Sequence, residues 1–406
     1  MSRRWVGLAY TDRRGRIFYD EESEPLADGG LVRPVLLDEL VRAPGGTVPV
    51  MLPGRSPLLR HGSALRRTAL GALLPAGYTR LLLPAYEERK DAPPLPLFGY
   101  AFACVVDDDL YVAAARTDED PNWKPRTFAE GELEKIVAAR LATDSGNPVL
   151  AQLARCSLEY GCFTAQNVFL EQGEAALAVS PKCNARCVGC ISELDDDAGI
   201  PSPQARIAYE IDADAPARIA IHHLERVPHG IVSFGQGCEG EPLLRATTIA
   251  RTIAKIRERT GTGTVNLNSN GSLPKSLQAL IDAGLDAVRV SLNSFRPPVY
   301  AAYYRPIGYE LDDVLESVRI ATRAGLRVSL NLLTHPGVTD DAPEVAAMTE
   351  FLRETPVALV QTRTLNIDPH RYFALTGRPK EPLGMRAALA AIRTAGIAVG
   401  NFTHTH

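Results

Sequence analysis

The most constraining feature of this sequence is a group of three cysteines within eight residues, Cys183, Cys187 and Cys190, spaced as Cys-x3-Cys-x2-Cys. The apolar run at residues 175–179 predicts a strand, so we expect the cysteines on the loop that follows it. Three thiolates on one loop can bind three corners of an iron–sulfur cubane and leave the fourth iron open. Zinc is the alternative, but it needs a fourth protein ligand, and no Cys or His follows at zinc-finger spacing. The spacing alone favours a cluster and leaves zinc open.

The composition is that of an ordinary soluble protein with no bias toward nucleic acid. The chain has 406 residues, enough for two or three domains, of which 45% are hydrophobic and 23% charged. Its formal net charge of -4 provides no general attraction to nucleic acid. No apolar run approaches the roughly 20 residues that span a bilayer, and the first residues lack the apolar core of a signal peptide. Seven clustered cysteines do not suit a disulfide scaffold, so we expect a reducing, cytoplasmic location and no membrane partner.

The pattern of residues 1–174 predicts a mixed α+β domain, and we expect this domain to recognise a substrate or a partner. Strands are expected at residues 5–10, 17–19, 48–52, 81–83, 99–106 and 110–115, and helical segments at 36–41 and 63–74. Three aspartates at residues 107–109 are interpreted as a hairpin turn rather than a metal site. Thr127 and Glu130 form a capping box before a helix over residues 133–141, and Asn147-Pro148 starts a second helix.

Residues 175–406 change to a repeated pattern of strand, loop and helix, which is typical of a parallel sheet. Strands are expected at residues 175–179, 231–234, 264–269, 287–291, 328–333 and 358–364. Helices are expected at residues 216–227, 245–259, 274–283, 311–324, 343–353 and 381–395. Six strands are too few for a closed eight-stranded barrel, so we expect an open partial barrel.

Polar residues gather where the expected strands end. Active sites of parallel α/β folds lie at the carboxyl ends of the strands, so this clustering is what an enzyme would show. The first strand leads into the three cysteines, and the second leads into Cys238, Gly240, Glu241 and Pro242. The later strand ends carry Asn270, then Ser291, Asn293 and Ser294, then Thr334 and His335, and finally Arg363, Asn366 and Asp368. The pattern predicts one site built from several strand ends.

The spacing and order of these motifs resemble the radical S-adenosylmethionine (SAM) superfamily over residues 175–369. Gly240-Glu241-Pro242 is similar to the motif that holds the amino group of SAM in that family. Ser291, Asn293 and Ser294 match a fourth-strand position where members contact the ribose and carboxylate of SAM, and Asn270-Gly271 is similar to family sequences. Arg363 and Asn366 are candidates for contacts with SAM or substrate. The fold that the resemblance implies is a six-stranded partial (β/α) barrel.

The resemblance also implies a reaction. Cys183, Cys187 and Cys190 would bind a [4Fe-4S] cluster, and SAM would chelate its open iron. An electron from a flavodoxin- or ferredoxin-like donor would cleave SAM to methionine and a 5′-deoxyadenosyl radical, which takes a hydrogen atom from the substrate. One position departs from the family, because the aromatic residue that precedes the last cysteine and packs on adenine is Gly189 here. Other residues must then hold the adenine.

Three further cysteines have open roles. Cys156, Cys162 and Cys238 are interpreted either as buried small apolar residues or as ligands of a second cluster or a zinc ion. In a third interpretation Cys238 alone is catalytic, as a thiol hydrogen-atom donor or a covalent partner. Because Cys238 lies three residues before Glu241, we expect it to face the active site.

The sequence therefore predicts a radical SAM enzyme without identifying its substrate. A small molecule is favoured over RNA or a peptide, because the chain has no clear RNA-binding module and no late cysteine-rich extension. The alternative from a different class is a zinc- or cluster-stabilised, non-catalytic binding protein on the same barrel. In that case Glu241 and the polar strand ends would have no role.

Overall fold

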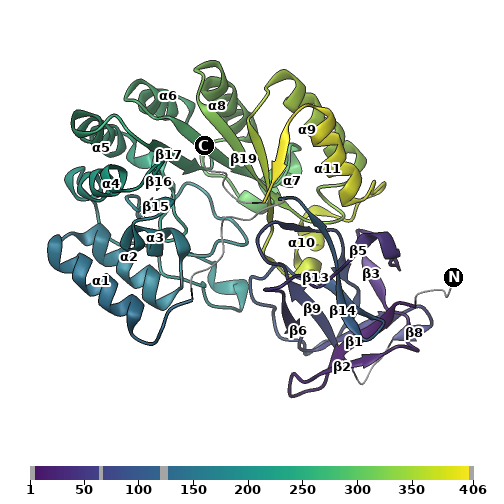
Figure 1. Cartoon of the computed structure of the whole chain (residues 1–406). Coiled ribbons are helices and arrows are strands. Elements are labelled where there is room, and N and C mark those ends of the chain that lie inside the picture. The colour runs from purple at the N-terminus through teal and green to yellow at the C-terminus, as the bar shows by residue number, and fades with distance from the viewer. Residues whose placement is uncertain (1–4, 64–66, 119–126, 402–406) are drawn as a thin grey trace.

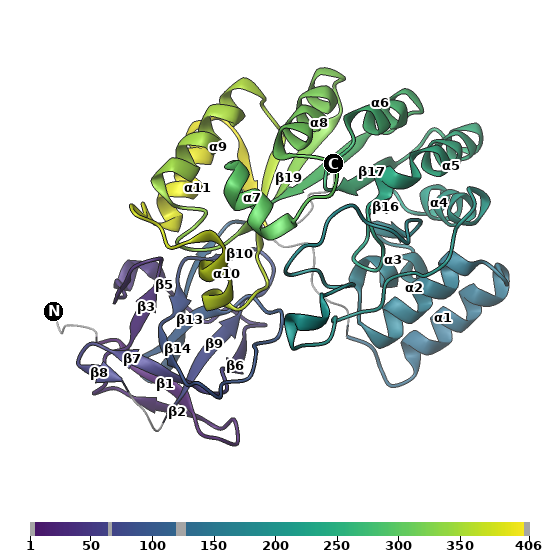
Figure 2. The same ribbon diagram turned by 180° about the vertical axis from the view of Figure 1, so that it is seen from behind.

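The computed structural model describes residues 5–63, 67–118 and 127–401, and three neighbouring regions follow one another along the chain (Figure 1). A β-rich region comes first, a group of three helices follows, and a half-barrel of strands and helices forms the rest. The view from behind shows the β-rich region and the three helices lying side by side beneath the half-barrel (Figure 2).

Seven parallel strands form the curved sheet of the half-barrel in sequence order, namely β15 (Glu174–Leu177), β16 (Ile231–Phe234), β17 (Thr264–Ser269), β18 (Ala287–Leu292), β19 (Arg327–Thr334), β20 (Leu359–Thr364) and β21 (Ala398–Gly400). The helices on its outer face are α4 (Asp214–Arg226), α5 (Ala246–Arg259), α6 (Pro274–Asp282), α8 (Leu311–Arg323), α9 (Ala342–Glu354) and α11 (Met385–Thr394) (Figure 1). The predicted partial barrel is confirmed. The sheet extends by one edge strand, β21, whose three residues are too few to form a recognisable pattern.

Helices cover the outer face of the sheet, which explains the buried apolar residues of its strands. α8 packs through Leu311, Val314 and Val318, the stripe that its sequence period indicates. Two short helices of eight residues each were not predicted from the sequence, α7 (Pro297–Tyr304) and α10 (Pro369–Thr376). Each has Pro in its first turn, where the missing N–H costs nothing, and the two helices pack on each other.

The β-rich region contains one large and two small sheets. The large sheet is built from β1 (Gly7–Thr11), β2 (Ile17–Asp20), β5 (Leu40–Arg42), β6 (Val48–Met51), β9 (Thr68–Leu73), β10 (Tyr78–Arg80), β13 (Ala101–Val106) and β14 (Asp109–Arg116). One small sheet has β3 (Leu26–Asp28), β4 (Val32–Pro34) and β11 (Leu83–Pro84), and the other has β7 (Arg55–Leu59), β8 (Gly62–Ser63) and β12 (Tyr86–Glu88). The β13–β14 hairpin turns at Asp107 and Asp108, whose φ angles are 50° and 64°.

Two helical predictions in this region are wrong. Residues 68–73, part of the segment expected to be helical, form β9, which pairs with β1, β6 and β13. Pairing on both edges of β9 overrides the helical preference of its Ala and Leu residues. Residues 64–66 of that prediction lie outside the described residues. The segment at 36–41 forms only a 3₁₀ turn, Leu37–Glu39, before β5 begins.

The helix group consists of α1 (Glu132–Thr143), α2 (Pro148–Glu159) and α3 (Phe163–Leu170). Asn147 caps α2 as expected, because its side chain accepts from the N–H groups of Val149 and Leu150. The predicted capping box at residues 127–130 is wrong, since α1 begins at Glu132 behind Gly131, whose φ is 71°. α3 packs on β15 and α2 on α4, so this group contacts the half-barrel directly. The domain boundary at residue 174 stays a prediction.

The β-rich region meets the half-barrel through buried polar contacts. Arg80 on β10 is fully buried and donates to the carbonyl oxygens of Tyr100, Thr334 and Leu365. The hydroxyl groups of Thr79 and Thr362 on β20 are hydrogen-bonded next to it. These contacts join the first part of the chain to the last strands of the sheet.

Over the three described ranges, no helix combines the length and the apolar character needed to cross a membrane.

Candidate active site

The three cysteines lie on the loop that follows β15, which we call the cysteine loop (residues 180–192). Cys183, Cys187 and Cys190 are all free and half-buried. The chain at the end of α7 supports this loop, because Val188 N–H donates to Tyr303 O (3.0 Å) and Arg186 N–H to Tyr304 O (3.0 Å). The short helix that the sequence pattern does not indicate is therefore one wall of the site.

The thiols of the cysteine loop need a positive partner before they can ionise. Burial raises the pKa of Cys183 to about 11 and that of Cys187 well above its ordinary value. Arg206 supplies part of the compensation, since its Nη2 donates to Cys190 Sγ (3.4 Å) and its Nε to Ser192 Oγ (3.2 Å). A bound metal would supply the rest, because a coordinating thiol is deprotonated outright.

The donor set of the cysteine loop fits a cluster better than a single ion. Within the described ranges, no group of three or more His, Cys, Asp or Glu side chains is placed to hold a metal ion. In a cubane each thiolate binds a different iron, so the thiolates do not have to converge on one point. Three free thiols at this spacing, with a guanidinium beside one of them, suit such a cluster.

A side chain at position 189 would crowd its neighbours. A Cβ added there would lie 2.9 Å from the Tyr303 hydroxyl oxygen and 3.1 Å from the Asn366 carbonyl oxygen. The absence of an aromatic residue at this position has a steric cause, because buried Tyr303 and the segment after β20 already fill the space. Asn366 is exposed beside it.

Glu239, which the sequence reasoning missed, joins the start of the cysteine loop to the end of β16. One carboxylate oxygen accepts from the N–H groups of Val179 and Ser180 (2.7 Å each), and the other accepts from Gly235 (2.5 Å) and Gln236 (2.9 Å). Burial raises the pKa of Glu239 to about 7, while the four N–H donors act in the opposite direction. A second glutamate two residues before Glu241 was the available signal.

Gly240 and Glu241 place the loop after β16 directly on the cysteine loop. The N–H of Gly240 donates to Ser180 O (2.6 Å), and that of Glu241 donates to Lys182 O (2.8 Å). A Cβ at Gly240 would lie 2.0 Å from Lys182 O, so only glycine allows this approach. Pro242 follows, buried, at the start of a 3₁₀ turn.

The Glu241 carboxylate is engaged by neighbouring donors. It accepts from the Ser269 hydroxyl (2.6 Å), the Asn270 N–H (2.8 Å) and the Leu243 N–H (2.9 Å), and burial raises its pKa to about 7. Asn270 in turn donates through Nδ2 to Asn184 of the cysteine loop (2.9 Å). Glu241 and Asn270 thus connect the ends of β16 and β17 to the cysteine loop, and their contact with SAM stays a prediction.

The fourth-strand candidates divide into two groups. Asn293 and Ser294 are buried, where Asn293 Nδ2 donates to Tyr372 Oη (2.9 Å) and the Ser294 hydroxyl donates to the Glu344 carboxylate. Ser291 instead lines a cavity. Contacts of all three with SAM stay predictions.

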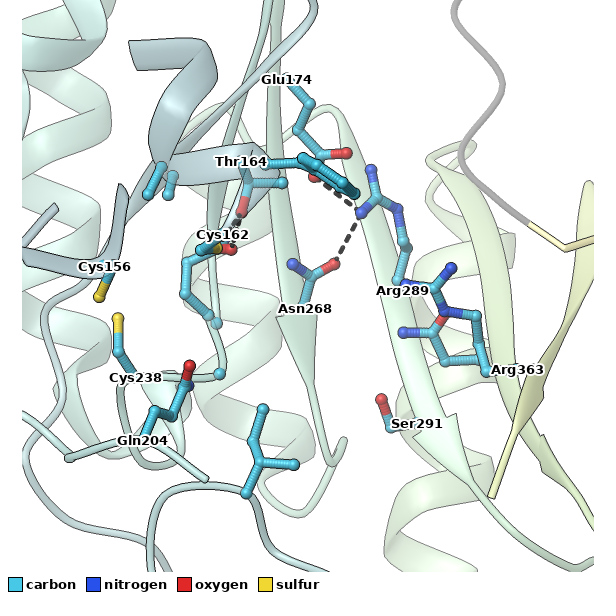
Figure 3. A pocket seen from close by; sticks show the side chains of 18 of the residues that line it. Cys156, Cys162, Thr164, Glu174, Gln204, Cys238, Asn268, Arg289, Ser291 and Arg363 are labelled. Carbon is cyan, nitrogen blue, oxygen red and sulfur yellow. Dashed lines mark hydrogen bonds and ion pairs between the residues drawn. The ribbon is translucent and has the colours of Figure 1, made fainter. Parts of the chain in front are cut away.

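A cavity of about 510 Å³ lies on the inner side of the curved sheet (Figure 3), and we call it the barrel cavity. Polar side chains from the strands form one wall, and α2, α3 and the loop after β16 form the other. Ile191, next to the cluster ligand candidate Cys190, also lines it. Its lining includes the polar or sulfur-bearing residues Cys156, Cys162, Glu174, Cys238, Asn268, Arg289, Ser291 and Arg363.

Cys156 on α2 and Cys238 after β16 form a thiol pair in the wall of this cavity, with their sulfur atoms facing each other (Figure 3). A hydrogen bond from Cys238 lowers the pKa of Cys156 to about 7, while this bond and burial raise the pKa of Cys238 far above its ordinary value. Cys162 lies near Thr164 Oγ1 (3.4 Å). Cys238 therefore lines the cavity, while its role in an active site and a second metal at these three cysteines stay predictions.

Charged residues inside the strands were also missed. Glu174 on β15 and Arg289 on β18 are both buried and form an ion pair of 2.7 Å inside the half-barrel. A charged residue at the centre of an apolar parallel strand, as in Ala-Val-Arg-Val, was the signal for Arg289, because buried charges in such strands are paired. Glu174 is the first residue of β15 and gave no such signal.

Known proteins match the half-barrel. The family model described as the Radical SAM superfamily matches residues 177–348. A GTP 3′,8-cyclase of Heliobacterium modesticaldum is 32% identical over 183 residues, which cover 45% of this chain and 51% of the relative. The FeMo cofactor biosynthesis protein NifB of Klebsiella pneumoniae is 26% identical over 249 residues, covering 57% of this chain and 51% of the relative. The chain spans about half the length of these curated relatives.

Two solved structures have lower sequence identity to this chain than these curated relatives. A radical SAM methyltransferase from Sphaerobacter thermophilus has 17% identity and a TM-score of 0.39, covering 55% of this chain and 64% of that one. Streptococcus suis SuiB bound to S-adenosylmethionine has 14% identity and a TM-score of 0.39, covering 66% of this chain and 60% of that one.

Proposed function

We propose that this chain, a radical SAM superfamily enzyme over residues 177–348, removes a hydrogen atom from a small molecule held in the barrel cavity. Membership brings a [4Fe-4S] cluster, SAM and an electron donor, as predicted from the sequence. When bound, cluster and SAM supply reductive cleavage of the sulfonium bond and a 5′-deoxyadenosyl radical that abstracts hydrogen. The protein's own residues must then bind these groups, orient the substrate and exclude water.

One observation carries this proposal, namely that the cysteine loop borders the barrel cavity. Ile191 directly follows Cys190 and lines the cavity, together with Gly237 and Cys238 from the loop after β16. A reactive group held at the cysteines would therefore lie at the edge of the barrel cavity. Its volume of about 510 Å³ is within the range of about 300–1,000 Å³ that is typical of small-molecule sites.

The ligand assignments are part of the proposal. Cys183, Cys187 and Cys190 bind the cluster, while Gly240, Glu241 and Pro242 shape the place of the amino group of SAM. Asn270, Ser291, Asn293, Ser294 and Asn366 complete the set of proposed SAM-contacting residues, and Arg363 is proposed to contact either SAM or the substrate. The hydrogen bonds that join Glu241 and Asn270 to the cysteine loop support this arrangement, because they couple the SAM-binding residues to the cluster ligands.

The thiol of Cys238 is proposed to donate a hydrogen atom to a carbon radical. This thiol lines the barrel cavity and keeps its proton, because burial and the neighbouring Cys156 raise its pKa. A flavodoxin- or ferredoxin-like protein is the proposed source of electrons, and the region before residue 174 is proposed to recognise a substrate or partner.

The decisive experiment is 5′-deoxyadenosine formation. We expect anaerobically reconstituted protein to release 5′-deoxyadenosine from SAM when it is reduced with dithionite. The Cys187→Ala variant should lose the brown chromophore and at least about 90% of the product, because it lacks one of three cluster ligands. The matched control, Cys104→Ala, removes a buried thiol of the β-rich region and should keep both.

Two outcomes would contradict the proposal in different ways. A full cluster that binds SAM without forming 5′-deoxyadenosine would refute the catalytic function and favour the binding-protein alternative. A full cluster in Cys187→Ala would refute only the ligand assignment.

A further inference from the structure

Two guanidinium groups enter the barrel cavity from neighbouring parts of its strand wall. Arg289 comes from β18 and Arg363 from β20, and Figure 3 shows both beside Ser291 and Asn268. Arg289 is buried, whereas Arg363 is exposed although it lies inside the half-barrel, because its accessible surface opens into the cavity. Arginine in such a place needs a reason, since a cation loses much of its hydration there.

The positive charge of Arg289 is balanced within the protein. Its Nη1 donates to Glu174 Oε1 (2.7 Å) and to Asn268 Oδ1 (3.1 Å). Glu174 also accepts from the Ser233 hydroxyl (2.5 Å), so its position is fixed from two sides. Arg289 is thus held rigidly, with the rest of its guanidinium turned toward the cavity.

The positive charge of Arg363 is not neutralised by a direct ion pair among the described residues. Its Nη1 donates to the carbonyl oxygen of Asn401 (2.9 Å), and no carboxylate of the described ranges lies within ion-pair distance of it. Desolvation inside the half-barrel, and then the charge of Arg289, lower the pKa of Arg363, while the charge of Glu174 raises it, and an arginine remains protonated at neutral pH. Glu174 is the only acid among the described residues that line the cavity.

The titratable groups of the opposite wall lie apart from both arginines. Two titratable groups of that wall, Cys156 and Cys238, interact with each other. Figure 3 places them across the cavity from Arg289 and Arg363. Cys162 lies on the same side as this pair. The strand wall therefore presents to whatever fills the cavity one cation, Arg363, that has no direct ion pair among the described residues.

We propose that the substrate carries a carboxylate or phosphate group that Arg363 binds, with Arg289 as a second donor. This inference rests on the proposed function, because it takes the barrel cavity to be the substrate site. The planar fork of arginine matches both oxyanions through two parallel N–H···O bonds. Glu174 acts as the positioning residue of this site, since it orients Arg289 and does not contact the substrate.

The test measures anion binding directly and does not require turnover. Inorganic pyrophosphate and succinate are titrated into the anaerobic, cluster-loaded protein by calorimetry, as the phosphate and carboxylate probes. We expect at least one of them to bind saturably, and Arg363→Gln to raise its Kd about tenfold or more. Arg363→Lys should give a smaller loss, because it keeps the charge and loses the fork. Arg353→Gln on the exposed face of α9 is the matched charge control and should bind like the wild type.

Three results would overturn the inference. They are no saturable binding of either probe to the wild type, an unchanged Kd in Arg363→Gln, and displacement of both probes by SAM. The last would assign the site to the carboxylate of SAM. Failure of the proposed function is a separate result, namely the absence of 5′-deoxyadenosine from wild-type protein, so the two are distinguishable.

Discussion

At the scale of single residues, the site depends on glycines whose missing side chains admit neighbouring backbone. Gly240 lies against the Lys182 carbonyl, and Gly189 lies against Tyr303 and the segment after β20. In both places the next residue is part of the predicted site. Glu241, after Gly240, is predicted to bind SAM, and Cys190, after Gly189, is predicted to bind the cluster. Glycine admits a backbone carbonyl at Gly240, and it admits both a side-chain hydroxyl and a backbone carbonyl at Gly189.

Gly240→Ala should damage the cluster site. Its Cβ would lie 2.0 Å from Lys182 O, a backbone atom next to Cys183, so the cysteine loop must move. We expect a destabilisation of about 1–3 kcal/mol and an iron content well below that of the wild type. Iron analysis and the thermal midpoint of unfolding measure both effects. Gly261→Ala is the control, because nothing lies within 4 Å of its Cβ; equal iron in both variants would contradict the role of Gly240.

At the scale of elements, α2 and the loop after β16 bring together two thiols from distant parts of the sequence. Cys156 is on α2, and Cys238 is on the loop whose next residues clamp the cysteine loop. The helix group before the half-barrel is thus part of the wall of the barrel cavity. This packing, rather than any local motif, gives Cys238 a neighbouring sulfur and a place at the cavity.

Deuterium labelling tests whether the Cys238 thiol donates a hydrogen atom. In D2O the thiol carries deuterium, and its transfer breaks the S–D bond, forms a C–D bond and leaves the unpaired electron on sulfur, which dithionite then reduces. We expect 5′-deoxyadenosine formed without substrate to contain deuterium in the wild type and in Cys162→Ala. In Cys238→Ala the deuterated fraction, measured by mass spectrometry, should fall at least about tenfold. Equal labelling in all three proteins would exclude Cys238 as the donor.

At the scale of the whole molecule, the β-rich region and the half-barrel share buried charges. Arg55 on β7 is almost fully buried and forms ion pairs with Asp368 after β20 and with Glu88 on β12, both at 2.8 Å. Tyr86 Oη also donates to Asp368 (3.3 Å). Asp368 caps α10, which packs on α7, the helix that supports the cysteine loop. The first and last parts of the chain are therefore coupled through a chain of contacts to the site.

Arg55→Met should destabilise the whole molecule. It leaves the Asp368 carboxylate without its cation in a buried setting, which costs about 3–5 kcal/mol when one partner of a buried pair is removed. We expect a lower thermal midpoint, and partial recovery in the double variant Arg55→Met/Asp368→Asn, because no unpaired buried charge remains at Asp368. Arg89→Met, which loses an exposed contact with Asp91, should cost less than about 1 kcal/mol. Similar losses in Arg55→Met and Arg89→Met would show that the buried pair is unimportant.

Local patterns in the sequence were sufficient for strands β15 to β20, for the outer helices of the half-barrel and for the three-cysteine loop. Apolar strands and amphipathic helices alternate along the chain because each helix must bury one face against the sheet. The spacing of residues such as Val314 and Val318 shows this face in the sequence. The cysteine spacing is local for the same reason, since one loop must present three thiolates to one cluster. Polar strand ends were also visible, because parallel strands collect their ends at one edge.

Tertiary structure alone decided which of those polar residues are open and which are engaged. In the sequence, Glu241, Asn293, Ser294, Ser291 and Arg363 are all polar residues at strand ends. In the structure, Glu241, Asn293 and Ser294 are hydrogen-bonded to buried partners, whereas Ser291 and Arg363 line the cavity. The helices α7 and α10, strand β9 and the Cys156–Cys238 pair likewise depend on partners far away in the chain. The physical reason is that burial and hydrogen-bond partners are properties of the packed chain, whereas periodicity and ligand spacing are properties of adjacent residues.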